Sequence, residues 1–106
     1  MTDKIVVFTT CGSEEEAHQL ATILVEKRLA VCVNITAPLS SVYRWKGVVE
    51  RAREWLLIVK SRQDRFEELR LAIEAAHSYE TPEVLALPVV EGSPSYLAWV
   101  DAEMAQ

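Results

Sequence analysis

The chain has 106 residues, of which 50% are apolar and 25% are charged, a composition typical of a single soluble domain spanning residues 1–106. Its net charge of −5 disfavours nucleic-acid-binding and membrane-binding proteins, because both classes usually carry a basic surface. No apolar stretch reaches the roughly 20 residues that a membrane-spanning helix needs. No secretory signal pattern is visible either, so we expect a cytoplasmic protein.

The first elements expected along the chain are a strand and a helix. The run "KIVVFTT" at residues 4–10 is rich in β-branched residues and predicts a strand. Ser13 and Glu16 then fit a capping box, in which each side chain binds a free amide at the start of a helix. We expect this helix over residues 13–28, where the basic residues at its end favour the helix dipole.

Residues 29–62 predict one long β-hairpin. Pro38 interrupts its first strand, and Gly47 marks the turn between its two strands. Acidic and basic residues interleave near the tip, where we expect cross-strand ion pairs. This tip is too polar and too long for the core of one subunit, which suggests that it pairs with a neighbouring copy.

The second half of the chain predicts a helix, a strand and a final helix. Asp64 and Glu67 form a second capping signature, and this helix should end near His77. The run at 83–90 is a strand, which Pro88 confines to an edge or a bulge. A last helix should start at Ser93-Pro94. The order βαββαβ plus a terminal helix predicts an α+β fold of the ferredoxin-like sandwich class.

The two cysteines are not expected to form a disulfide in a reducing cytosol. Cys11 ends the first apolar run just before Gly12, a position that can be exposed. Cys32 lies within the run "LAVCVNI" and is interpreted as a small buried apolar residue.

The segment "HSYETPE" at residues 77–83 gathers a His, a Tyr and two carboxylates in one short bend. His77 could bind a metal, or simply favour the negative end of the preceding helix. Tyr79 is suited to packing at a subunit boundary with its hydroxyl hydrogen-bonded. Thr81-Pro82 favours an extended entry into the next strand. Both a metal site and a structural corner therefore remain open interpretations.

No assembled catalytic constellation is visible, and we expect a protein that is not an enzyme. The loop after the first strand holds three acidic residues and no base, which disfavours phosphate binding at the following helix. A nucleophilic Cys11 would need a histidine partner, and neither His18 nor His77 has a spacing that indicates one.

Five ordered segments resemble the CutA family of divalent-cation tolerance proteins. They are "KRLAVCVNI", "SSVYRWKG", "EWLLIVKS", "HSYETPEVLALPV" and "YLAWV". The resemblance extends from about residue 5 to residue 100. It implies a ferredoxin-like subunit in a tight homotrimer like that of the PII signalling proteins, and a role in tolerance of copper or other divalent metals.

The resemblance also implies candidate metal ligands. Copper binding in relatives has been discussed at a Cys ending the first strand, a His pair ending the second helix, and the Glu after Thr-Pro. Here Thr9 takes the place of that Cys, with Cys11 two residues later, and Ala76-His77 takes the place of the pair. Glu83 matches. The candidate ligands for copper or another divalent cation are therefore His77 and Glu83, with Cys11 as a further candidate.

A cleft between subunits is the second expected site. Trp45 lies at the hairpin tip, and we expect it to contact a neighbouring copy or a small ligand. The residues assigned to this cleft or trimer interface are Tyr43, Trp45, Tyr79, Thr81 and Pro82. The alternative is a PII-like signalling or scaffold trimer that binds a protein partner, with metal binding incidental.

Overall fold

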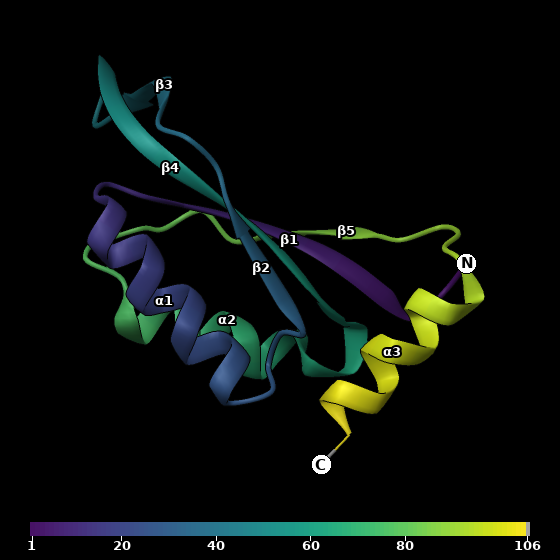
Figure 1. Cartoon of the computed structure of the whole chain (residues 1–106). Helices are drawn as coiled ribbons and strands as arrows, with labels where there is room; N and C mark the ends of the chain where they lie inside the picture. Colours follow the sequence, from purple (N-terminus) through teal and green to yellow (C-terminus); the bar gives the residue numbers. More distant parts are fainter. Residues whose placement is uncertain (106) are drawn as a thin grey trace.

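A computed structural model describes residues 1–105 and shows, over that range, an antiparallel five-stranded sheet and three helices (Figure 1). In chain order the elements are β1 (Lys4–Cys11), α1 (Glu14–Glu26), β2 (Cys32–Ile35), β3 (Leu39–Trp45), β4 (Val48–Arg62), the 3-10 turn η1 (Gln63–Arg65), α2 (Phe66–Ala76), β5 (Leu85–Pro88) and α3 (Pro94–Met104). The α+β class and the order of elements agree with the prediction.

The sheet order is β2-β4-β1-β5, and all neighbouring strands are antiparallel. β3 pairs with the other half of the long strand β4, so the predicted hairpin at 29–62 is confirmed. Lys46 and Gly47 form its tip with positive φ angles of 49° and 84°. A two-residue turn with this geometry matches the right-handed twist of the two strands.

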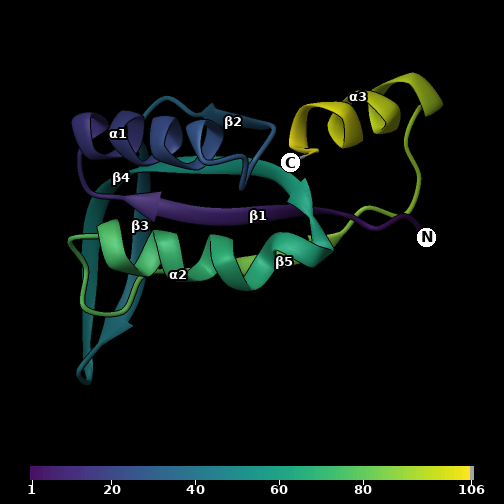
Figure 2. The same cartoon turned by 90° about the horizontal axis from the view of Figure 1, so that it is seen from below.

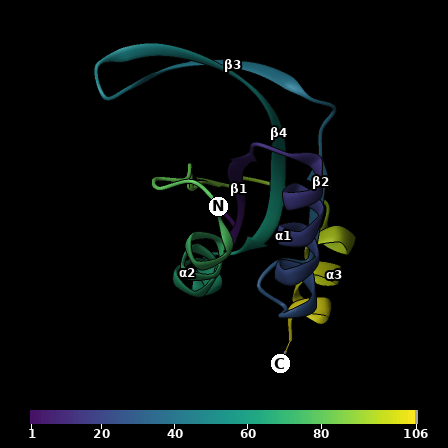
Figure 3. The same cartoon turned by 90° about the vertical axis from the view of Figure 1, so that its left-hand side faces the viewer.

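The hairpin bends where β2 gives way to β3. Ala37 and Pro38 lie together opposite the single residue Trp55, since Thr36 bonds to Leu56 and Leu39 pairs with Glu54. An extra residue on one strand increases the local twist and bends the pair. Figure 3 shows β3 and β4 curling away from the rest of the sheet beyond this point. The curl carries the hairpin tip over one end of the sheet.

Helices α1 and α2 lie on the same face of the sheet (Figures 2 and 3). The core between them takes alternate residues of β1, including Val7 and Cys11, together with Leu20 of α1 and Ile73 of α2. Cys11 is fully buried, so the exposed position that the sequence allowed for it is not found. It is the last residue of β1 rather than part of the loop, and the strand's alternation turns its side chain inward.

The start of α1 confirms half of the predicted capping box. The Ser13 hydroxyl accepts from the Glu16 amide at 3.2 Å, but the Glu16 carboxylate accepts from the Ser78 amide at 3.0 Å instead of turning back. The helix ends at Glu26, two residues earlier than predicted. Arg28 takes a positive φ of 57° after the helix, a common way for a helix to terminate.

The predicted cap at Asp64 is wrong. Residues 63–65 form a 3-10 turn, and α2 begins at Phe66 without a side-chain cap. The Asp64 carboxylate instead accepts from the Arg62 guanidinium at 2.6 Å. The end of the helix is as predicted, because His77 is the residue that follows its last turn.

The last elements also follow the prediction, with a shorter strand. β5 covers only Leu85–Pro88 and pairs with β1 alone, so the edge position that Pro88 indicates is confirmed. α3 starts at Pro94 and buries Val100 and Met104. Among the described residues, no helix is long and apolar enough to cross a membrane.

The sheet face opposite α1 and α2 is apolar and uncovered in the single chain. Leu85 and Leu87 of β5 are 58% and 44% exposed, and they lie opposite Phe8 and Val6 of β1. Cys32 belongs to this face, because its neighbours in β2 pack against the core on the other side. It is half-buried, not buried as expected.

Candidate functional site

The chain segment at residues 77–83 connects α2 to β5 at the end of the sheet where β1 runs into α1 (Figure 1). Two features meet at this corner. One is a cluster of metal-ligating side chains on the helix side, and the other is a cleft beneath the curled hairpin. The sequence-predicted residues divide between these two features.

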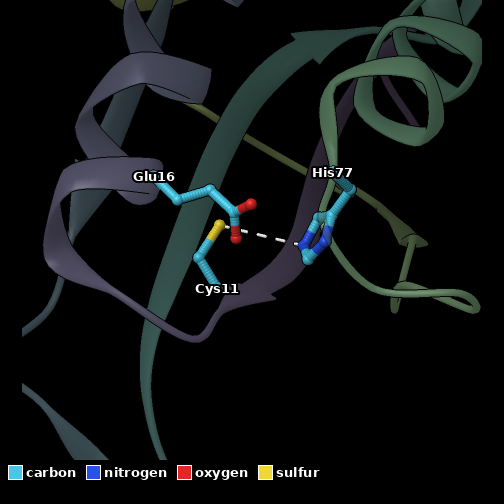
Figure 4. A group of neighbouring side chains, drawn as sticks. All are labelled: Cys11, Glu16 and His77. Carbon is cyan, nitrogen blue, oxygen red and sulfur yellow. Dashed lines mark hydrogen bonds between the residues drawn. The ribbon is translucent and has the colours of Figure 1, made fainter.

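The cluster consists of Cys11 at the end of β1, Glu16 in the first turn of α1 and His77 after α2 (Figure 4). One ligand atom of each lies within 4.8 Å of the others. The distance between Cys11 Sγ and His77 Nε2 is 3.8 Å. A tetrahedral metal bound to a sulfur and a nitrogen would separate them by about 3.5 Å. The spacing of these two atoms is therefore close to that of a metal site.

Hydrogen bonds define the protonation of His77. Its Nδ1 accepts from the Tyr79 amide at 3.0 Å, and its Nε2 lies 2.7 Å from the Thr10 carbonyl. An amide can only donate and a carbonyl can only accept, so the ring is neutral and carries its proton on Nε2. A metal at Nε2 would have to replace that proton and disrupt the bond to Thr10.

The Cys11 thiol also holds its proton firmly. Burial raises its pKa to about 12, and the nearby Glu16 and Glu54 carboxylates add to the effect. A metal binds the thiolate, so it must displace this proton. The same two carboxylates favour a cation beside the sulfur. The ligand types and spacing thus suit a divalent cation, while the hydrogen bonds oppose tight binding.

Sequence reasoning missed Glu16 as a member of this cluster. In the sequence it fits a helix cap, and only the tertiary contact with Ser78 places its carboxylate beside Cys11 and His77. Glu83, the other ligand implied by the resemblance, is not in the cluster. It lies on the wall of the neighbouring cleft.

The cleft has a volume of about 740 Å³ and lies between β3, the end of β1 and the segment 79–83. Its lining residues are Thr10, Ser41, Val42, Tyr43, Arg44, Trp45, Glu54, Tyr79, Glu80, Thr81, Pro82 and Glu83. Every residue that the sequence assigns to the ligand cleft is among them. The bulge before β3 brings the hairpin above the corner, so a single chain is enough to bring these residues together.

Glu54 forms the buried part of the cleft lining and is 6% exposed. The Tyr79 hydroxyl donates to its Oε2 at 2.7 Å. Burial and this hydrogen bond raise the pKa of Tyr79 well above its usual value, so the phenol keeps its proton. Within residues 1–105 Glu54 forms no ion pair, contrary to the cross-strand pairing expected near the tip.

Gly12 allows Tyr79 to approach Glu54. A Cβ atom at residue 12 would lie 2.9 Å from the Tyr79 hydroxyl oxygen, closer than real Cβ contacts come. Neither Gly12 nor Glu54 stands out in the sequence as a cleft residue. The only indication in the sequence is that Gly12 follows the predicted end of the first strand. A glycine at that position is equally typical of an ordinary turn.

Basic side chains lie at the mouth of the cleft. Lys46 Nζ is 3.9 Å from a Glu80 oxygen and 5.5 Å from the centroid of the Trp45 ring. Arg44 donates to the Gly47 carbonyl at 3.3 Å, within the hairpin turn. Lys46 and Glu80 are both mostly exposed, so their ion pair is weak.

Comparisons with known proteins agree on the family. The CutA1 divalent ion tolerance protein family model matches residues 5–103. The divalent-cation tolerance protein CutA of Thermus thermophilus is 47% identical, covering 90% of this chain and 92% of that protein. The chloroplastic protein CutA of Arabidopsis thaliana is 45% identical over 91% of this chain, which spans only 53% of that longer protein.

Solved structures support the same assignment. The structure of the periplasmic divalent cation tolerance protein CutA from Archaeoglobus fulgidus superposes with a TM-score of 0.92. It is 40% identical, and the match covers 95% of this chain and 98% of the other. Both the family model and the relatives span nearly the whole described chain. The chain therefore belongs to the CutA1 divalent ion tolerance protein family.

Proposed function

We propose that this protein acts in divalent-cation tolerance by binding copper or another divalent cation at Cys11, Glu16 and His77. The observation that carries this proposal is the convergence of a thiol, a carboxylate and an imidazole within 4.8 Å. Sulfur and nitrogen ligands together favour copper and zinc over hard cations. We assign Glu83 to the adjacent cleft, where a small ligand binds.

Binding at this cluster should be weak and should strengthen as the pH rises. A bound metal must displace the protons on Cys11 Sγ and His77 Nε2, and the Tyr79 amide donates to the other ring nitrogen. Proton release on metal binding makes affinity depend on pH.

Calorimetric titration with copper tests the metal proposal. His77→Ala should weaken binding at least tenfold, because it removes the nitrogen ligand. The matched control is His18→Ala, since His18 is exposed on α1 and lies outside the cluster. Equal heats from the wild type and His77→Ala would show that His77 is not a ligand.

We further propose a ferredoxin-like subunit in a cytoplasmic homotrimer. The uncovered sheet face with Leu85 and Leu87, which are 58% and 44% exposed, supports self-association. Large exposed apolar patches usually mark interaction surfaces. Sedimentation equilibrium at micromolar concentration should report a trimer, and a stable folded monomer would rule the assembly out.

A binding role is proposed in place of catalysis. The buried Cys11 thiol stays protonated at neutral pH, which makes it a poor nucleophile. The second candidate is a scaffold trimer that docks a protein partner, favoured by the exposed Val48 and Val49 beside the hairpin tip. Pull-down from lysate with and without chelator separates the two. A partner retained equally in chelator favours the scaffold.

A further inference from the structure

We infer that the cleft under the hairpin binds an organic cation bearing ammonium groups, such as an aliphatic polyamine, with Glu54 as its buried anchor. This inference rests on the proposal that the cleft takes a small ligand, and it names the chemical class of that ligand. Four observations support this inference: the charge of the cleft lining, the burial of Glu54, the position of Lys46 and the volume of the cleft.

The cleft lining is negatively charged. Glu54, Glu80 and Glu83 contribute three carboxylates, and Arg44 is the only basic residue among the lining residues. The Arg44 guanidinium donates to the Gly47 carbonyl in the hairpin turn and forms no ion pair within the described chain. The three carboxylates outnumber the two basic side chains, Arg44 in the lining and Lys46 at the mouth, so a positively charged ligand meets a net attraction here.

Glu54 is the strongest single indication. A carboxylate that is 6% exposed would normally be paired with a cation, because burying an unpaired charge is costly. Within the described part of the chain, the one hydrogen bond that Glu54 makes comes from the neutral Tyr79 hydroxyl, at Oε2. Its other oxygen makes no hydrogen bond among residues 1–105 and is not a fully buried atom, so it is accessible from the cleft that Glu54 lines. A ligand ammonium in the cleft would supply the missing positive charge.

Lys46 shows how the cleft rim holds an ammonium group. Its Nζ lies over the Trp45 ring at 5.5 Å from the centroid and 3.9 Å from the Glu80 carboxylate. Attraction to an aromatic face combined with a nearby carboxylate is a common way to recognise organic cations. Tyr43 and Tyr79 line the same cleft, so aromatic surface continues inward from Trp45 toward Glu54.

Size and spacing favour an organic cation over a bare metal ion. Among the described residues, the only group of three or more ligating side chains close enough to share a metal is that of Cys11, Glu16 and His77. The cleft carboxylates are therefore too widely spaced to bind one ion together. The volume of about 740 Å³ falls in the range of small-molecule sites. A flexible chain with several ammonium groups can reach separate carboxylates.

The experiment is a calorimetric titration of the metal-free full-length protein with spermidine. The wild type should bind one spermidine per chain in a saturable manner. Glu54→Gln should weaken binding at least tenfold, because the amide keeps an oxygen for the Tyr79 hydroxyl while removing the charge. Glu83 lies on the exposed wall of the cleft, and Glu83→Gln should weaken spermidine binding about threefold. This second variant still tests the inference if Glu54→Gln does not fold.

Matched controls separate a built site from general charge attraction. Glu91→Gln removes the same charge from the loop before α3, at the opposite end of the sheet, and should bind spermidine within twofold of the wild type (Figure 1). The uncharged 1,8-octanediol should not bind. The inference is overturned if spermidine fails to bind, if both Glu54→Gln and Glu83→Gln bind like the wild type, or if Glu91→Gln loses as much as either. Binding of the diol would also overturn it.

The outcome is separable from that of the metal proposal. Glu16→Gln should bind spermidine as the wild type does, since Glu16 belongs to the metal cluster and does not line the cleft. A protein that binds spermidine but not copper would contradict only the metal proposal. A protein that binds copper but not spermidine would contradict only this inference. A single chain already forms the cleft, so the titration can be interpreted even if the protein proves monomeric.

Discussion

Removing the Tyr79 hydroxyl tests whether the bond to Glu54 stabilises the corner. In Tyr79→Phe the buried Glu54 oxygen loses its donor at 2.7 Å, while the ring is retained and no large cavity forms. Hydrogen bonds to charged groups contribute about 1.5–3 kcal/mol to stability. At about 4–8 °C per kcal/mol for a domain of this size, the thermal unfolding midpoint should fall by roughly 6–24 °C.

Urea and thermal unfolding at one fixed protein concentration measure this loss, since an oligomer's stability depends on concentration. Tyr96→Phe is the matched control, because Tyr96 is 42% exposed on α3 and its hydroxyl has no hydrogen-bond partner among the described residues. It should change stability by less than about 0.5 kcal/mol. If Tyr79→Phe is no more destabilising than Tyr96→Phe, the hydrogen bond to Glu54 does not stabilise the fold.

Three further predictions concern the same end of the sheet. Gly12→Ala should cost about 1–3 kcal/mol in urea unfolding, because its Cβ would displace the Tyr79 hydroxyl, whereas Gly92→Ala meets only the flexible Leu97 side chain and should cost less. The folded protein keeps the Cys11 proton up to a pKa of about 12, while the unfolded chain releases it above 9.0. The free energy of unfolding measured in urea should therefore fall between pH 9 and pH 12. For Cys11→Ala it should fall less steeply over the same range. Gly47→Ala should lower stability by about 1 kcal/mol, since φ is +84° there and a Cβ is strained at that angle; an unchanged midpoint would contradict this.

The sequence predicted the features that depend on local interactions. Alternation and turn residues indicate the long hairpin, and Gly47 lies in its two-residue turn as expected. Ser13 indicates the start of α1, and Pro88 indicates an edge strand. The aromatic and Thr-Pro residues of the cleft were identified because the corner and the hairpin tip are both recognisable in the chain.

The predicted helix caps were wrong where a carboxylate bonds to a group elsewhere in the folded chain instead of to its own helix. Asp64 fits a helix cap, but the Arg62 guanidinium takes its carboxylate and the helix starts later. Glu16 fits a capping box, but its carboxylate accepts from the Ser78 amide across the corner. In both cases the sequence pattern was correct for an isolated helix, and a partner in the folded chain competed for the same oxygen.

The sequence by itself determined the order of elements, the hairpin and the family resemblance, because these depend on periodicity and on residues close together in the chain. Only the tertiary structure decided which side chains share a site. Cys11, Glu16 and His77 converge because β1, α1 and α2 end at one corner, and Glu54 is buried because the bulge at Pro38 curls the hairpin over the sheet. Such contacts join residues far apart in the chain, and no local pattern records them.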